Sequence, residues 1–106
     1  MNNARELLKL AAKAAGIDGE WGDNEHPGGE GIWDCCSCWN PLVSDALALR
    51  LAVKLGIGTE VWKGQAWAWK DGAKNEPIAI EGLGDDPYAA TRRAIVRAAA
   101  EIGRMK

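Results

Sequence analysis

The fold is decided by the stretch D-P-Y-A-A-T-R-R-A-I-V-R-A-A-A-E-I, residues 86–102. Asp86 is a good helix-capping residue, and Pro87 suits the first helical position, where no backbone N–H is needed. The stretch therefore predicts a helix to about Ile102. Its inner face is predicted from side chains at heptad spacing: Tyr88, Thr91, Ile95, Ala98 and Ile102.

The arginines of this helix fall into two groups. Arg93, Arg97 and Arg104 lie opposite the inner face and are expected in solvent. Arg92 lies at the boundary between the faces. From such a position an arginine can lay its stem on apolar surface and extend its guanidinium into a cleft.

Two more helices are predicted upstream. One spans about residues 3–15, and the other spans 44–55, with Ser44 as its cap and Gly56 as its stop. The second helix is apolar nearly all round, apart from the Arg50–Lys54 stripe. This pattern predicts that it is largely buried.

The remaining segments predict strands. Residues 59–62, 65–69 and 76–80 are expected to form three strands, the first two joined as a hairpin. Side chains alternate between the faces of a strand. Trp67 and Trp69 should therefore share one face of the sheet, opposite two alanines. Residues 17–31, which are rich in Gly, Asp and Glu, predict a loop, with short strands flanking it at 17–21 and 31–36.

Length and charge narrow the class of protein. The chain has 106 residues and a net charge of −2, which suits one domain over residues 1–106. A nearly balanced charge argues against binding to long nucleic acid. No apolar run is long enough for a transmembrane helix, and the start, MNNARELLKL, lacks the pattern of a signal peptide. We expect a cytoplasmic protein with no membrane partner.

Four stretches resemble a known family. They are WNPL at 39–42, DALALRLAVKL at 45–55, DPYAATRRAIVRAAAE at 86–101 and ELLKLAAKAAG at 6–16. Together they look like the phage ABA-sandwich domain family of small phage and prophage proteins. The resemblance implies an α/β (α+β) three-layer sandwich. Three helices would cover both faces of an antiparallel sheet of about four to five strands, in the order α-β-α-β-β-β-α. It supplies no catalytic residue.

Metal and acid–base chemistry have weak support. Cys35, Cys36 and Cys38 are spaced unlike a structural zinc site, although His26 could join two of them. The loop acids Asp23, Glu25, Glu30 and Asp34 follow no metal-binding pattern. We expect free thiols, no metal, no cofactor and no catalytic group. A role for the cysteines beyond packing stays open.

Tryptophan is unusually frequent. The chain has six Trp, one Tyr and no Phe. Indole rings stack on the bases of nucleotides, and arginine grips phosphate. The predicted ligand-binding residues are Trp33, Trp39, Asn40, Trp62, Trp67, Trp69 and Arg92.

These features predict a small phage accessory protein that binds rather than catalyses. Its function would be counter-defence, by sequestering a nucleotide-derived signal in a Trp/Arg-lined pocket at a subunit boundary of a homo-oligomer. Two alternatives remain open. Exposed Trp and Arg also suit an inhibitor that binds a host defence enzyme. The acidic loop with His26 would suit a metal-assisted phosphodiesterase.

Overall fold

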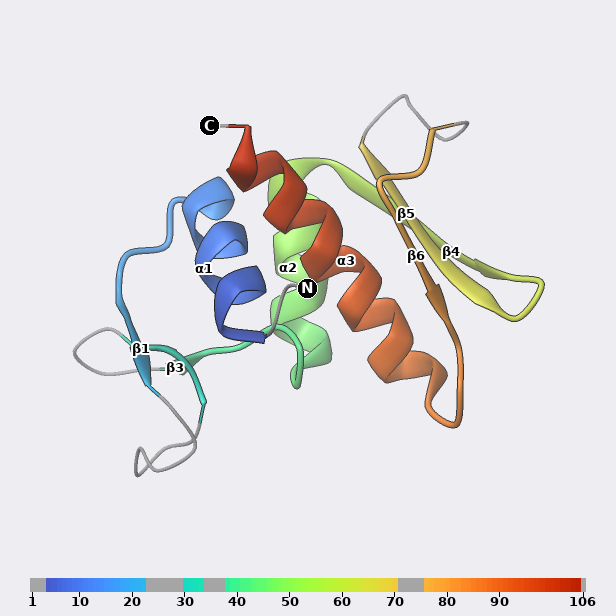
Figure 1. The fold of residues 1–106 in the computed structure, drawn as a ribbon, viewed down its shortest axis with the longest axis horizontal. Helices are drawn as coiled ribbons and strands as arrows, with labels where there is room; N and C mark the ends of the chain where they lie inside the picture. The colour runs from blue at the N-terminus through green and yellow to red at the C-terminus, as the bar shows by residue number, and fades with distance from the viewer. Residues whose placement is uncertain (1–3, 23–29, 34–37, 71–75, 106) are drawn as a thin grey trace.

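The computed structural model describes residues 4–22, 30–33, 38–70 and 76–105. They form an α+β fold with three helices and two small antiparallel sheets (Figure 1). The helices are α1 (Ala4–Ala15), α2 (Asp45–Leu55) and α3 (Pro87–Arg104). The strands are β1 (Glu20–Gly22), β2 (Gly31–Trp33), β3 (Cys38–Trp39), β4 (Ile57–Trp62), β5 (Gln65–Lys70) and β6 (Ala79–Gly82).

Helix α3 begins as its sequence predicts. The Asp86 side chain accepts hydrogen bonds from the backbone N–H groups of Tyr88 and Ala89, at 3.0 and 3.1 Å. These bonds satisfy two of the free donors of the first turn. Ile95, Ala98 and Ile102 are buried as expected, whereas Tyr88 is 70% exposed. The prediction for Tyr88 was wrong because its position lies at the open end of the helix, over a groove described below.

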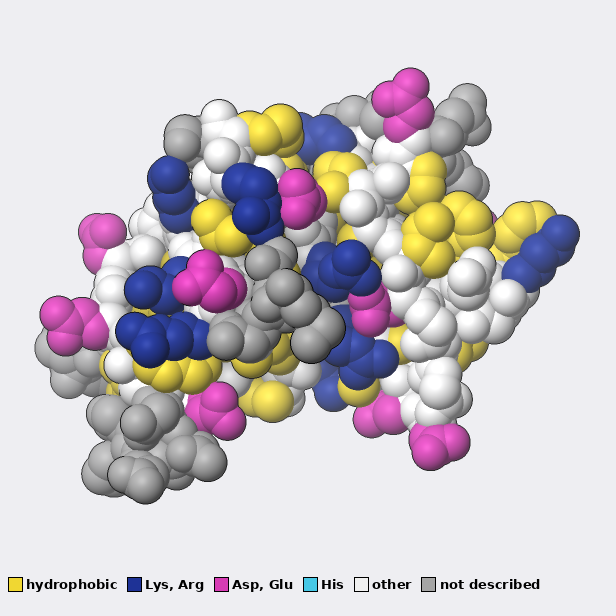
Figure 2. Space-filling model, in the orientation of Figure 1, with side chains coloured by type: hydrophobic (Ala, Val, Ile, Leu, Met, Phe, Trp, Pro, Cys, Tyr) yellow, Lys and Arg dark blue, Asp and Glu magenta, His cyan; other side chains and the backbone are white. Residues whose placement is uncertain are grey.

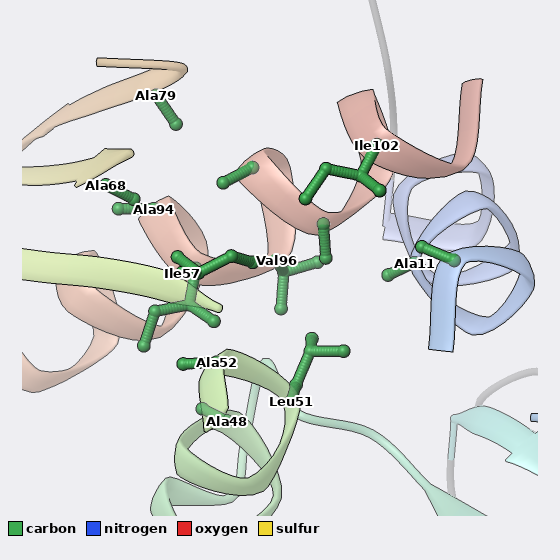
Figure 3. Close-up of a cluster of buried hydrophobic side chains, with 14 of the residues drawn as sticks. Ala11, Ala48, Leu51, Ala52, Ile57, Ala68, Ala79, Ala94, Val96 and Ile102 are labelled. Carbon is green, nitrogen blue, oxygen red and sulfur yellow. The ribbon is translucent and has the colours of Figure 1, made fainter. Parts of the chain in front are cut away.

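Helix α3 is the central element of the fold. It contacts α1, α2 and all three strands of the β4–β6 sheet. Small side chains allow this close packing on several sides. Ala90, Ala94, Ala98 and Ala99 are fully buried, and Figure 3 shows Ala94 and Val96 within the cluster that joins these elements. The sequence predicted one inner face of five side chains, but the buried part of this alanine-rich helix is wider and leaves only the arginine stripe and the first turn exposed.

The outer stripe of α3 is confirmed. The side chains of Arg93, Arg97 and Arg104 are 44%, 47% and 47% exposed. Arg93 and Arg97 both pair with Glu81 of β6, which ties the exposed side of the helix to the sheet.

Helix α2 has the predicted ends and less burial than predicted. The Ser44 hydroxyl accepts from the backbone N–H of Leu47 at 3.2 Å, and Gly56 ends the helix with a left-handed φ of 68°. Yet Leu49 and Val53 are 64% and 75% exposed. The prediction of a largely buried helix was wrong because only the Ala48, Leu51 and Ala52 side of α2 meets the rest of the chain.

The described strands form two sheets instead of the one sheet of four to five strands that was expected. Their orders are β1-β2-β3 and β4-β5-β6, both antiparallel. After β3 the chain turns at Pro41 into α2 and then enters β4, and these two strands lie in separate sheets. The helices occupy the middle of the molecule, with one sheet on either side (Figure 1). The three-layer order with a central sheet is therefore not seen in the described residues.

The β4–β6 sheet turns its small side chains toward α3. Ala66, Ala68 and Ala79 are buried on that face. Figure 3 shows Ala68 and Ala79 among the buried side chains near α3. Trp67 and Trp69 alternate with the alanines and lie on the opposite face, as predicted. No described helix covers that opposite face. Among the described helices, none has the length and apolar character needed to cross a bilayer.

Candidate functional site

Trp39 lies in a pocket between the end of α1, strand β3 and helix α2. The pocket has a volume of about 180 Å³. Trp39 is half-buried and packs against the core. The lining residues are Ala15, Ile17, Trp39, Leu47, Arg50, Leu51 and Lys54. An indole ring and two cations therefore share one pocket.

The two cations of this pocket lie on successive turns of α2. Arg50 and Lys54 are four residues apart, a spacing that places both on one side of a helix. Both are exposed, and neither is paired with a carboxylate within the described part of the chain. Their charges are therefore available to an anionic group.

A second hollow adjoins this pocket, and both are lined by Ile17. It has a volume of about 270 Å³ and lies between α1 and β2. Lys9 and Lys13 line it, together with Asp18. Four basic side chains thus surround neighbouring hollows on this part of the surface.

Asn40 has a structural position. It is 8% exposed, and its side-chain amide donates to the backbone carbonyl of Glu30 at 2.9 Å. Its Oδ1 accepts from the backbone N–H of Leu42 at 3.0 Å. This turn fixes the corner that leads from Trp39 into α2. Asn40 therefore fixes the turn next to Trp39 and is not among the residues that line the Trp39 pocket.

Arg92 lines a different groove. This groove, of about 240 Å³, lies between α2, α3 and β4. The Arg92 guanidinium donates from Nε to the backbone carbonyl of Leu42 at 2.8 Å and from its terminal nitrogen to Asp45 at 2.7 Å. Arg92 was predicted to extend its guanidinium into a ligand cleft, and it is among the residues that line this groove. No tryptophan is among the lining residues: Asp45, Ala48, Leu49, Thr59, Tyr88, Thr91, Arg92 and Ile95.

The tryptophans of the second sheet lie on its open face. Trp62 is 57% exposed, and the Lys63 ammonium lies 4.5 Å from its ring centroid. Trp67 is half-buried, and its Nε1 is buried without a hydrogen-bond partner among the described residues. Trp69 lies over Gly58, where a Cβ would clash with the indole. Exposed hydrophobic side chains are visible over this sheet beside a basic one in Figure 2.

The predicted site residues therefore occupy three places. Trp33 and Trp39 belong to the β1–β3 sheet, where Trp33 is half-buried on β2. Trp62, Trp67 and Trp69 belong to the other sheet, beyond the helices (Figure 1). Arg92 lies with neither group. One chain does not bring all of them into a single pocket.

Sequence reasoning missed the partners of Trp39. Arg50 and Lys54 appeared only as the polar stripe of a buried helix. Their signal was the pairing of two cations at i,i+4 directly after the Trp39-Asn40-Pro41 corner. In the structure this corner brings α2 back beside Trp39.

The described residues contain no group of side chains arranged as a metal-binding site. No three His, Cys, Asp or Glu side chains among them lie together as a metal site would require. Cys38 is a free thiol that donates to the Glu30 carbonyl at 3.4 Å, and burial raises the pKa of this thiol. The other residues considered for metal binding lie outside the described residues: Asp23, Glu25, His26, Asp34, Cys35 and Cys36.

Comparisons with known protein families, with curated proteins and with solved structures found no match.

Proposed function

We propose that this protein binds a small anionic ligand with a flat ring, of the nucleotide-derived class, at the Trp39 pocket. The observation that supports this function best is that Trp39 and Arg50 line the same pocket, with Lys54 one turn away. The Trp/Arg pocket expected from the sequence is thus assigned to Arg50 in place of Arg92.

The residue types suit such a ligand. Stacking of a base on an aromatic side chain contributes about 1–3 kcal/mol. A hydrogen bond from a charged donor contributes about 1.5–3 kcal/mol. One ring on Trp39 and one phosphate on Arg50 would together contribute about 2.5–6 kcal/mol, whereas a Kd of about 1 mM needs about 4 kcal/mol. Further contacts, such as those of Lys54, are therefore required to offset the association costs.

The size of the pocket limits how the ligand sits. Sites that enclose a small molecule commonly have volumes of about 300–1,000 Å³. The Trp39 pocket, at about 180 Å³, holds one ring or one phosphate. The rest of the ligand would extend over Ile17 toward Lys9 and Lys13 in the adjoining hollow. A ligand with two anionic groups fits this layout best.

The biological role we propose is sequestration by a small phage accessory protein that acts in the host cytoplasm against a defence signal. The resemblance of residues 6–16, 39–42, 45–55 and 86–101 to the phage ABA-sandwich family motivates this role. The site supports binding because it offers an aromatic surface and fixed cations, and the proposal assigns no catalytic step to them.

Native mass spectrometry of the full chain tests this function. The protein would be purified from a bacterial host with active defence systems. We expect a retained small anionic molecule that is absent from an Arg50→Ala variant and present in an Arg104→Ala variant. A wild-type protein that carries no such molecule, and binds none when nucleotides are added, would rule the function out.

A second candidate function is inhibition of a host enzyme through the open sheet face. The observation that favours it is the exposure of Trp62 and Ile80, at 57% and 40%, on a face that no described helix covers. Aromatic residues dominate the binding energy of many protein interfaces. Capture of one host protein by the wild type but not by Trp62→Ala would support this function.

A further inference from the structure

Strand β4 is a free edge of its sheet. It pairs with β5 on one side, and no described strand pairs with its other side. Exposed edges are usually protected by proline, by charged side chains, above all lysine, or by being very short. β4 has six residues, IGTEVW, with no proline or lysine and with Glu60 as its one charged residue. Its outer side is therefore long enough, and protected little enough, for another strand to pair with it.

An apolar surface lies next to this edge. The groove between α2, α3 and β4 includes Leu49, Thr59 and Tyr88. Leu49 and Tyr88 are 64% and 70% exposed. Val53, one turn after Leu49, is 75% exposed, and Val61, two residues after Thr59 on the same face of β4, is 50% exposed. These four side chains, of the eight large apolar ones that are exposed among the described residues, thus lie in this groove or on the elements that border it.

We propose that a second copy of this chain binds here. Its β4 pairs antiparallel with this β4 across a two-fold axis, so that the two three-stranded sheets become one continuous sheet. The helix α2 of each copy then covers the exposed Leu49–Val53 stripe of the other. A two-fold dimer requires a self-complementary surface, because the same patch is used on both sides.

The apolar stripe of α2 suits this requirement. Leu49 and Val53 are four residues apart and lie on one side of the helix. Arg50 and Lys54 line the Trp39 pocket on another side of α2, so the proposed contact does not use these two cations.

The strand register is also self-complementary. When Thr59 lies opposite its own symmetry mate, Ile57 lies opposite Val61, and β-branched side chains pair well across strands. Gly58 then lies opposite Glu60. The two Glu60 side chains are thereby kept from facing each other directly, which like charges disfavour.

Sedimentation of the full chain tests the dimer. We expect a particle of twice the 11.4 kDa chain mass for the wild type. Leu49→Glu and Val61→Lys place charges in the contact and should give monomers. Met105→Lys, at a residue 78% exposed on the last turn, should remain dimeric. A monomeric wild type, or a dimer that survives both contact variants, would overturn the proposal.

Hydrogen exchange gives a second measurement that needs no variant. Protection of the β4 amides should rise with protein concentration, while the β6 amides should not respond. Equal behaviour of the two edge strands would contradict the β4 contact. Ligand binding at the Trp39 pocket is a separate property, so either proposal can fail while the other stands.

Discussion

Arg92 Nε donates a hydrogen bond to the backbone carbonyl of Leu42 at 2.8 Å, joining positions fifty residues apart. The same guanidinium pairs with Asp45, the first residue of α2. Helix α3 thereby holds the corner between Trp39 and α2 in place. The side chain that was expected to receive a ligand instead positions the segment that forms the pocket.

Removal of this tether should cost stability. The Arg92 side chain is 17% exposed, so the site it shares with the Leu42 carbonyl is largely closed to water. Arg92→Ala therefore removes a charged donor from this carbonyl that water replaces poorly. We expect a loss of about 1.5–3 kcal/mol in the free energy of unfolding. Arg104→Ala, which removes an exposed i,i+3 pair, should cost less than about 1 kcal/mol. Urea denaturation measures both, and equal losses would contradict the tether.

The burial observed along α3 predicts that truncating two of its large side chains, Ile95 and Tyr88, lowers the free energy of unfolding by unequal amounts. Ile95 is 5% exposed and Tyr88 is 70% exposed. Ile95→Ala should lower the free energy of unfolding by about 2–5 kcal/mol because it leaves a cavity. Tyr88→Ala should change it by less than about 0.5 kcal/mol in the monomer. Thermal unfolding of the two variants checks this, and a larger cost at Tyr88 would be inconsistent with the fold.

Gly103 permits the close approach of α3 to α1. A Cβ at this position would clash with the backbone carbonyl of Leu10. In an exposed helix, glycine to alanine stabilises by about 1 kcal/mol. Here Gly103→Ala should destabilise instead, because neither backbone can move without separating the helices. Gly82→Ala has no atom within 4 Å of the added Cβ and serves as the control. Stabilisation by Gly103→Ala would mean that the helices cross elsewhere.

Cys38 should be a slowly reacting free thiol. Burial raises its pKa in the folded chain, so folding favours the neutral form. That contribution to stability is complete below the unfolded pKa and is lost as the pH rises through the folded pKa. In a Cys35→Ser/Cys36→Ser variant, alkylation at fixed pH should be slower in the native than in the unfolded protein.

For the wild type, titration in denaturant should find 3 thiols per chain. One tightly held zinc per chain would contradict this.

The features that were predicted correctly depend only on residues close to one another in the sequence. The Ser44 and Asp86 caps are confirmed because a cap needs only the next three backbone groups. The faces of Trp67 and Trp69 are confirmed because alternation is a property of any strand.

Features that depend on distant contacts were harder to predict. The exposure of Leu49 and Val53 depends on which elements reach α2, and apolar character does not specify the partner. The two sheets were expected as one because strand patterns carry no information on which edges meet. Arg50 joined Trp39 only through the turn at Pro41, which the sequence indicated as a corner without its direction.

Calorimetric titration of the full chain with a panel of nucleoside phosphates, cyclic nucleotides and ADP-ribose measures ligand binding at the Trp39 pocket. We predict that at least one member of the panel binds with a Kd below about 1 mM. Arg50→Ala should weaken that binding by about tenfold to a hundredfold, as loss of a charged hydrogen bond implies, while Arg104→Ala leaves it unchanged. No binding below about 1 mM by any member of the panel, or equal binding to the two variants, would contradict a ligand site at Trp39 and Arg50.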